Sequence, residues 1–499
     1  MLVRPEPSQE AAPIWFVTKE TWPRIRADLP ERAVAFASAC GFEATPGRVQ
    51  LLPDELGGIA AVLFGIEDEG ARTRDLFLPG QLAAGLPAGL YRFANTPHDP
   101  ALAALSWLLS CYRFRRYKEK DHGSNLPRLC IPDGIDAARI ELVANAVAFG
   151  RDLINTPAND MNPDALEAAA LCLAAQHHAK TSVIRGDALL EASLPLIHAV
   201  GRAAEKEPRL VDFSFGDEAK PKVTLVGKGV CFDSGGLDIK PESAMSLMKK
   251  DMGGAATALA LASMIMESAL SVRLRVLIPI VENAISDKAF RPGDIYKSRK
   301  GLTVEIGNTD AEGRLILADA LALADEEAPE LLFDFATLTG AARVALGPDL
   351  PPFYAMDETL ASEISRFGIA ANDPVWRLPL WDPYDKLLEG KIADLNNISG
   401  SPFAGSITAA LFLRRFVERT ASWAHFDIFA WTPKTAPGRP EGAEVQTARL
   451  LYDLIEARYG AGTGADQSAS NTLRVAHHVK VTRDDLPLDE EAGLEDKSP

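Results

Sequence analysis

Short apolar runs punctuated by proline and glycine mark the first hundred residues. Ile14–Val17 and Ile59–Ile66 are predicted strands, and a helical pattern extends from Pro100 to Tyr117. The stretch His122–Asp136 carries glycine, asparagine and two prolines, a composition common in linkers. We therefore expect a small N-terminal α/β domain over residues 1–130.

Helix and strand patterns alternate through residues 131–459. Apolar residues at Ile140, Val143, Val147 and Ile154 have helical spacing, and this helix should end before Pro157. Five further runs are predicted buried strands: Val223–Val226, Leu274–Ile280, Thr303–Ile306, Leu331–Phe335 and Ala424–Ile428. Alanine-rich helical stretches at Ala255–Ser268 and Leu315–Glu326 separate some of them. The alternation predicts a larger α/β domain with a mostly parallel central sheet covered by helices.

The last forty residues, 460–499, differ in composition from the rest of the chain. They begin with small and polar residues, and residues 483–499 hold seven acids against two bases. We expect this segment to be a flexible acidic tail.

Composition narrows the class of protein. The chain has 499 residues, of which 47% are hydrophobic and 24% charged, as in ordinary globular proteins. No apolar run is long enough for a membrane span and the start lacks a signal-peptide pattern, so we expect a cytoplasmic protein without membrane contact. The five cysteines are scattered without a CxxC pair, which argues against a zinc ribbon or a disulfide framework.

Net charge argues against nucleic acid as the main partner. The chain carries 52 basic and 69 acidic residues, a balance of -17 that repels a phosphate backbone. One basic cluster, at residues 113–120, is interleaved with Phe114 and Tyr117. A nucleic-acid or partner contact is conceivable there, but we favour a solvated helix end followed by a loop.

Two segments after predicted strands are dense in polar residues. Gly227–Gly236 follows one strand, with Lys240 and Lys250–Gly254 beyond it, and Gly307–Leu315 follows another. Ligands in open α/β sheets bind beyond the carboxyl ends of strands. We therefore expect four carboxylates to meet at one edge of the sheet: Asp233, Asp251, Asp310 and Glu312.

Any one of these acids alone could cap a helix or pair with a lysine. Four together repel unless cations neutralise them, and two divalent ions would balance four negative charges. Neither segment contains histidine, so the ligands would be rich in oxygen and compatible with manganese, magnesium or zinc. Lys228, Lys240 and Arg314 share these segments. A lysine could coordinate a metal as the neutral amine, and otherwise these cations would act as electrostatic clamps on developing negative charge.

A serine or cysteine mechanism fits these segments poorly. Ser234 and Cys231 have no histidine nearby in the sequence to activate them. We therefore favour metal chemistry over nucleophilic catalysis.

The segment Asn308–Leu315, NTDAEGRL, resembles the signature octapeptide of the leucyl (cytosol) aminopeptidase family of dinuclear metallopeptidases at all eight positions. The runs GKGVCFDSGG, KDMGGAA and FATLTGA are similar to other blocks of that family, and similarity extends over most of residues 90–455.

The resemblance implies roles for individual residues. Asp233 and Glu312 would bridge two metal ions, Asp310 would complete one site, and Lys228 with Asp251 would complete the other. Lys240 and Arg314 match the two catalytic cations, with Arg314 holding a bicarbonate that acts as general base. The side chain of the first substrate residue would pack near three further positions: Met248, Thr337 and Gly340.

The resemblance thus implies a metal-dependent aminopeptidase that releases N-terminal amino acids from peptides, with leucine-like or broad preference. It would use two divalent ions, manganese or zinc with magnesium as a third candidate, and assemble as a homohexamer. The sequence departs from the family at Asp238 and after Trp431, so leucine preference does not follow automatically.

Two other functions stay open at this point. A two-metal phosphoesterase also uses clustered acids, although it commonly recruits histidines and has no use for the octapeptide. A DNA-binding architectural role, which some family members combine with peptidase activity, is opposed by the net charge and favoured only by the basic cluster.

Overall fold

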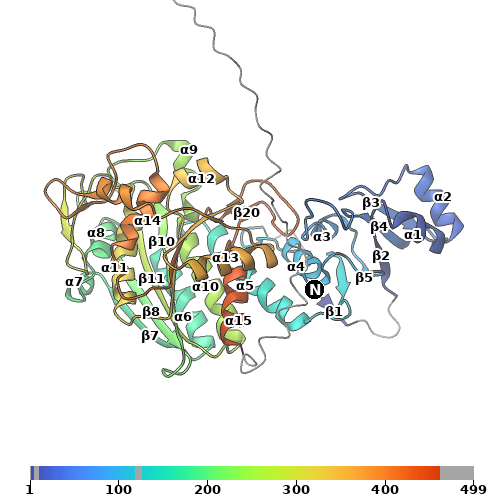
Figure 1. Ribbon diagram of the computed structural model, residues 1–499, viewed down its shortest axis with the longest axis horizontal. Coiled ribbons are helices and arrows are strands. Elements are labelled where there is room, and N and C mark those ends of the chain that lie inside the picture. Colours follow the sequence, from blue (N-terminus) through green and yellow to red (C-terminus); the bar gives the residue numbers. More distant parts are fainter. Residues whose placement is uncertain (1, 5–9, 119–125, 461–499) are drawn as a thin grey trace, which may run out of the picture.

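The computed structural model describes residues 2–4, 10–118 and 126–460, which form a smaller N-terminal and a larger domain side by side (Figure 1). The N-terminal sheet has six strands in the order β1, β6, β5, β2, β4, β3 and is parallel except between β3 and β4. Its strands are Leu2–Val3, Arg128–Cys130, Leu90–Phe93, Ala12–Val17, Ile59–Gly65 and Val49–Pro53. Its helices are α1 (Trp22–Asp28), α2 (Glu31–Ala39), α3 (Gly80–Gly85) and α4 (Pro100–Ser110).

The larger domain is built on a sheet with the strand order β16, β15, β18, β14, β9, β11, β8, β7, and β10 also pairs with β11. These strands are Trp376–Arg377, Pro352–Ala355, Trp423–Asp427, Leu331–Ala336, Lys222–Gly227, Arg273–Asn283, Arg209–Phe215, Lys180–Arg185 and, for β10, Gly229–Asp233. The central strands β18, β14, β9 and β11 are parallel, whereas β15, β8 and β7 pair antiparallel with their inner neighbours. The predicted fold class is confirmed.

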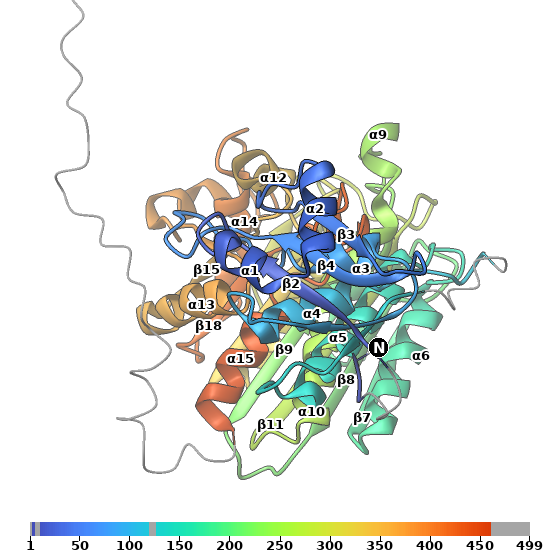
Figure 2. The same ribbon diagram turned by 90° about the vertical axis from the view of Figure 1, so that its right-hand side faces the viewer.

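Helices cover both faces of this sheet (Figure 2). One face packs against α5 (Ala137–Asn155), α6 (Pro163–Gln176), α10 (Gly253–Glu267), α13 (Glu358–Ala370) and α15 (Ala448–Tyr459). The other packs against α8 (Pro195–Gly201), α11 (Glu312–Asp325) and α14 (Gly405–Arg414). Successive strand residues alternate between the two cores, Leu225 with Phe333 on one side and Val226 with Leu332 on the other, as strand geometry requires.

Shorter elements connect these layers. The helical turns are α7 (Ala188–Glu191), α9 (Glu242–Met245), α12 (Gly340–Leu346), η1 (Met248–Met252) and η2 (Asp382–Leu388). A separate three-stranded sheet contains β12 (Ile295–Lys297), β13 (Thr303–Glu305) and β17 (Leu395–Asn396), and β19 (Trp431–Thr432) pairs with β20 (Gly442–Ala443).

The buried guanidinium of Arg151 helps to join the two domains. It lies on α5, is fully buried, and donates hydrogen bonds to the Leu109 carbonyl at 3.1 Å and to the Gly438 carbonyl at 2.8 Å. It also forms an ion pair with Glu444 at 2.8 Å. One side chain therefore links the end of α4 to two segments of the larger domain.

Two local predictions were wrong in the N-terminal part. The helix predicted to reach Tyr117 ends at Ser110, where Arg113 donates to the Ser110 carbonyl at 2.7 Å. The Tyr117 hydroxyl donates to Asp160 of the larger domain at 2.5 Å, which draws the following loop away from the helix axis. The expected linker also contains β6, which pairs with β1 and β5 and so belongs to the N-terminal sheet.

The expectation that all four acids leave one sheet was also wrong. The strand before Asp310 and Glu312 is β13, which pairs with β12 and β17 in the three-stranded sheet. Apolar content predicted a strand at this position, although only Val304 of β13 is buried, and it could not say which sheet the strand joins.

None of the helices within the described ranges is long and apolar enough to cross a membrane. The expected acidic tail lies beyond the described residues, except for Gly460.

Candidate functional site

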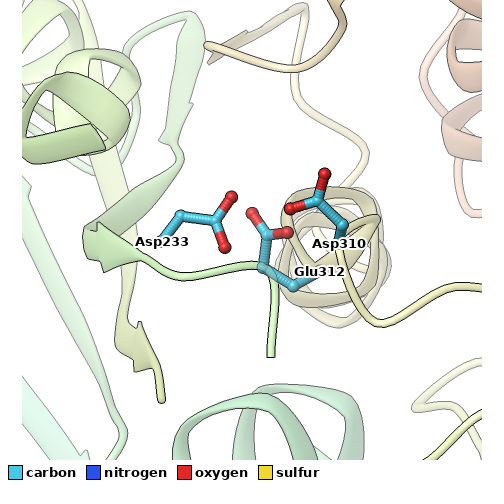
Figure 3. A group of neighbouring side chains, drawn as sticks. All are labelled: Asp233, Asp310 and Glu312. Atoms are coloured by element: carbon cyan, nitrogen blue, oxygen red, sulfur yellow. The ribbon is translucent and has the colours of Figure 1, made fainter. Parts of the chain in front are cut away.

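Three carboxylates converge between the end of β10 and the start of α11. Asp233 is the last residue of β10, Asp310 lies in the turn before α11, and Glu312 is the first residue of α11. One oxygen from each of the three lies within 4.8 Å of the others, and Figure 3 shows the groups facing one another. The structure therefore brings together three of the four predicted acids directly.

Two lysines lie between pairs of acids. The Lys228 ammonium is 2.8 Å from Asp251 and 2.9 Å from Glu312, which connects Asp251 to the cluster. Lys240 lies 2.8 Å from Asp233 and 2.5 Å from Asp310. Burial disfavours the charged form of both lysines, but the surrounding carboxylates outweigh it and raise the pKa of each.

The acids themselves are held in an unfavourable environment. Burial, together with the charge of Asp233, raises the pKa of Glu312 to about 8. The same two causes raise the pKa of Asp310 to about 6, although Lys240 opposes them. A divalent cation among these groups would relieve this repulsion.

The carboxylate oxygens fit such an ion. Both Glu312 oxygens and one Asp310 oxygen are buried and accept no hydrogen bond of regular geometry from the described residues. One Glu312 oxygen and this Asp310 oxygen instead form ion pairs with Lys228 and Lys240. Buried polar atoms without partners are uncommon in folded proteins. Oxygen donors at this separation suit manganese, magnesium or zinc, so the residues present fit a divalent metal.

Two neighbours hold the acids in place. Asn283, the last residue of β11, donates to Asp233 at 2.8 Å and to the Thr309 carbonyl at 3.1 Å. Thr337 donates its hydroxyl to Asp251 at 2.7 Å, and its carbonyl accepts from Lys228 at 3.1 Å. The sequence analysis missed Asn283, although a polar residue ending a central strand was a usable signal.

Arg314 is buried beneath the octapeptide loop. Its guanidinium donates to the Asn397 carbonyl at 2.6 Å, while its Nε has no hydrogen-bond partner among the described residues. Burial lowers the pKa of Arg314 to about 10. The Asn397 side chain accepts from the Gly307 amide and donates to the Asn308 carbonyl, both at 2.7 Å. No sequence pattern indicated Asn397, because it comes from a segment distant along the chain.

Gly313 of the octapeptide lies close to the side chain of Lys228. A Cβ on Gly313 would lie 2.6 Å from Cε of Lys228 and 2.8 Å from its ammonium. Only glycine lets Lys228 reach Glu312 past the first turn of α11.

Asp238, where the sequence departs from the family, is hydrogen-bonded to the octapeptide loop at Thr309. Its carboxylate accepts the Thr309 amide at 2.8 Å, and its own amide donates to the Thr309 hydroxyl at 2.9 Å. The substitution is thus compatible with the octapeptide loop rather than disruptive.

The three predicted substrate-pocket residues lie in different environments. Thr337 is buried beside Asp251, and Met248 is half-buried at the start of η1. Gly340 is exposed at the start of α12, with open space around its Cα.

Two different family models match the two domains of the chain. Residues 148–452 match the catalytic-domain model of the cytosol aminopeptidase family, and residues 13–132 match the M17 aminopeptidase N-terminal domain. A probable cytosol aminopeptidase of Syntrophotalea carbinolica is 40% identical over 409 residues, which cover 78% of this chain and 81% of that protein. A probable cytosol aminopeptidase of Chlamydia abortus is 43% identical over 63% of this chain and 64% of that protein.

Solved structures agree with this relationship. The cytosol aminopeptidase of Coxiella burnetii is 44% identical, with a TM-score of 0.86 over 91% of this chain and 98% of that chain. The bottromycin maturation enzyme BotP, in complex with Mn, is 30% identical, with a TM-score of 0.79 over 90% of this chain and 99% of that chain. The matched residues include the whole acid cluster, and the chain belongs to the cytosol aminopeptidase family of peptidases.

Proposed function

We propose that this protein is a metal-dependent aminopeptidase that releases N-terminal amino acids from peptides. The observation that carries the proposal is the cluster of Asp233, Asp310 and Glu312, whose oxygens lie within 4.8 Å of one another and include a buried Glu312 Oε2 that accepts no hydrogen bond from the described residues. Family membership supports peptide substrates, and the Mn complex of BotP supports a divalent metal.

Five residues are proposed to hold two ions: Lys228, Asp233, Asp251, Asp310 and Glu312. Glu312 lies beside Lys228 and Asp233 beside Lys240, and oxygens of the two acids lie within 4.8 Å of each other, which suits ligands shared between two ions. Lys228 would have to lose its proton to serve as an amine ligand, and its ion pairs with Asp251 and Glu312 place its nitrogen beside the other ligands. When bound, paired divalent ions supply an activated water and polarise the scissile carbonyl.

Lys240 and Arg314 are proposed as the catalytic cations. Lys240 lies beside Asp233 and Asp310, where its ammonium would stabilise negative charge that develops on the substrate. Arg314 has a buried Nε without a partner among the described residues, which suits an anion such as bicarbonate acting as general base.

Substrate preference and assembly complete the proposal. Met248, Thr337 and Gly340 would contact the first side chain of the substrate, with leucine-like or broad preference. The protein is proposed to be a cytoplasmic homohexamer, with residues 1–130 as the N-terminal domain and 131–459 as the catalytic domain. The absence of a membrane-crossing helix in the described part of the chain is compatible with this location.

A metal-readdition assay tests the proposed activity. The protein is treated with a chelator, and hydrolysis of a panel of aminoacyl amides, including the leucyl amide, is measured before and after addition of Mn, Zn or Mg. We expect activity to vanish and to return with at least one metal, and an N-acetylated substrate to resist hydrolysis. Unchanged activity in the metal-free protein would refute the metal mechanism.

The same preparation separates the competing functions. A phosphoester substrate should not be hydrolysed, and a gel-shift titration with duplex DNA at low salt should show no binding. Phosphoester hydrolysis that exceeds amide hydrolysis would favour the phosphoesterase instead.

A further inference from the structure

A groove that shares no residue with the acid cluster runs between four helices of the catalytic domain, α5, α6, α10 and α15, which lie on one side of the sheet (Figure 2). Its volume is about 860 Å³. Leu142 and Phe149 of α5 and Leu173 of α6 give it apolar walls. Such a surface is of the size that binds a peptide segment or a ligand.

The groove is acidic as well as apolar. Asp136, Glu141, Glu267 and Glu456 line it, against one lining base, Arg139. Arg139 is already engaged, because it lies 2.9 Å from Glu456 and 2.5 Å from Asp453. The remaining negative charge favours a basic partner.

A segment of matching character follows α15 in the same chain. Residues 473–483, LRVAHHVKVTR, contain three cations and two histidines but no acid, whereas residues 484–499 hold seven acids. Apolar residues occupy the odd positions 473, 475, 479 and 481, and two of the three cations occupy the even positions 474 and 480, so an extended segment would have one mainly apolar side. This segment therefore complements both the apolar walls and the charge of the groove.

The segment can also reach the groove. Gly460 follows Glu456, a lining residue, by four positions, or about 6 Å of helix. The twelve intervening residues, 461–472, are rich in Gly, Ala and Ser and can span up to about 40 Å.

We propose that residues 473–483 dock intramolecularly in the groove between α5, α6, α10 and α15. The valines and Leu473 cover the apolar walls, and the three cations lie near the lining acids. The acidic end, residues 484–499, is repelled from the same surface and extends beyond it. This docking is separate from the peptidase site and does not depend on the proposed function.

Cys172 offers a direct readout, because it lines the groove and is exposed in the described part of the chain. Its alkylation by N-ethylmaleimide is followed by peptide mass spectrometry in the full chain and in a chain ending at Gly460. Cys40, exposed at the end of α2, is the internal control, and the buried thiols of Cys111, Cys130 and Cys231 report any unfolding.

We expect Cys172 to react more slowly in the full chain, with Cys40 unchanged. A tethered segment has an effective concentration on the order of millimolar, so a dissociation constant of about 0.1 mM would slow labelling about tenfold. Added salt should reduce the difference, because screening weakens the attraction between exposed charges.

Charge reversal identifies the segment responsible. The triple variant Arg474→Glu, Lys480→Glu, Arg483→Glu in the full chain should label at the rate of the truncated chain. The matched variant Asp489→Lys, Glu490→Lys, Glu491→Lys changes as many charges and should remain protected.

Three results would overturn the proposal. Equal Cys172 rates in the full and truncated chains would show that the tail does not cover the groove. Protection that persists in the triple variant would assign the cover to another segment. If Cys172 of the truncated chain becomes more protected as protein concentration rises, a second copy of the chain covers the groove instead of the tail.

Discussion

Glu312 is buried, and its carboxylate forms an ion pair with Lys228 but accepts no hydrogen bond of regular geometry from the described residues. Burial and Asp233 raise its pKa to about 8, far above the value of 4.5 for a free glutamate side chain. Between these two values the folded metal-free protein holds a proton that the unfolded chain has released. Its stability should therefore fall as pH rises through this window.

We predict that the melting temperature of the metal-free protein declines from about pH 5 to about pH 8 through this linkage. The decline should be smaller in Glu312→Gln, which has no proton to lose at this position, and in the metal-loaded protein. Calorimetry across this range provides the measurement. A metal-free protein that gains stability toward pH 8 more steeply than Glu312→Gln would contradict the assigned direction.

The activity of single variants separates metal chemistry from a serine mechanism. Losing an outer hydrogen-bond partner of a metal ligand costs about 10–100-fold, so Glu312→Gln, which alters a proposed ligand itself, should lose more than about 100-fold. Ser234→Ala should remain close to the parent, because the Ser234 hydroxyl donates to the Asn283 carbonyl and to none of the four acids. Steady-state hydrolysis of a leucyl amide measures the activity of both variants. Equal losses of activity would favour a serine mechanism over metal chemistry.

At the scale of elements, the link through Arg151 on α5 can be tested by stability. Arg151→Met leaves the buried carboxylate of Glu444 without its ion pair, which costs about 3–5 kcal/mol. We predict a clear fall in the denaturation midpoint and partial recovery in the double variant Arg151→Met, Glu444→Gln. The surface variant Arg377→Met should change little. An Arg151→Met protein as stable as the parent would show that this link contributes little.

Patterns that repeat within one element were predictable from the sequence. The spacing of Ile140, Val143, Val147 and Ile154 predicted α5, and apolar runs predicted the central strands β9, β11, β14 and β18. What joins elements was not predictable, because long-range pairing leaves no local pattern. Sheet membership of β13 and the contact between Asn397 and Arg314, 83 positions apart, became visible only in three dimensions.

The functional site was likewise predictable only in part from the sequence. The octapeptide and its companion blocks predicted from the sequence alone that Asp233, Asp251, Asp310 and Glu312 lie close together. The pairing of Lys228 with Glu312 and of Lys240 with Asp310 depends on distances that sequence spacing does not encode. The required absence of a side chain at Gly313 follows from the same distances.

At the scale of the whole molecule, the acidic balance bears on assembly. Residues 461–499 hold eight acids and four bases and contribute -4 to the net charge of -17, so a chain ending at Gly460 carries -13 and repels its copies less strongly. We predict that the proposed hexamer and its peptidase activity survive this truncation. Light scattering on both chains measures the mass. A monomer in either case would refute the hexamer, and loss of the hexamer only on truncation would reveal a structural role for the tail.

We propose that the carboxylates between β10 and α11 hold the divalent ions on which peptide hydrolysis depends. Anomalous diffraction from crystals grown with Mn, recorded on both sides of its absorption edge, tests this directly. We expect two peaks, both within coordination distance of Asp233 and Glu312, one also beside Asp310 and the other beside Asp251 and Lys228. Crystals of protein that Mn activates but that show no peak among these residues would contradict it.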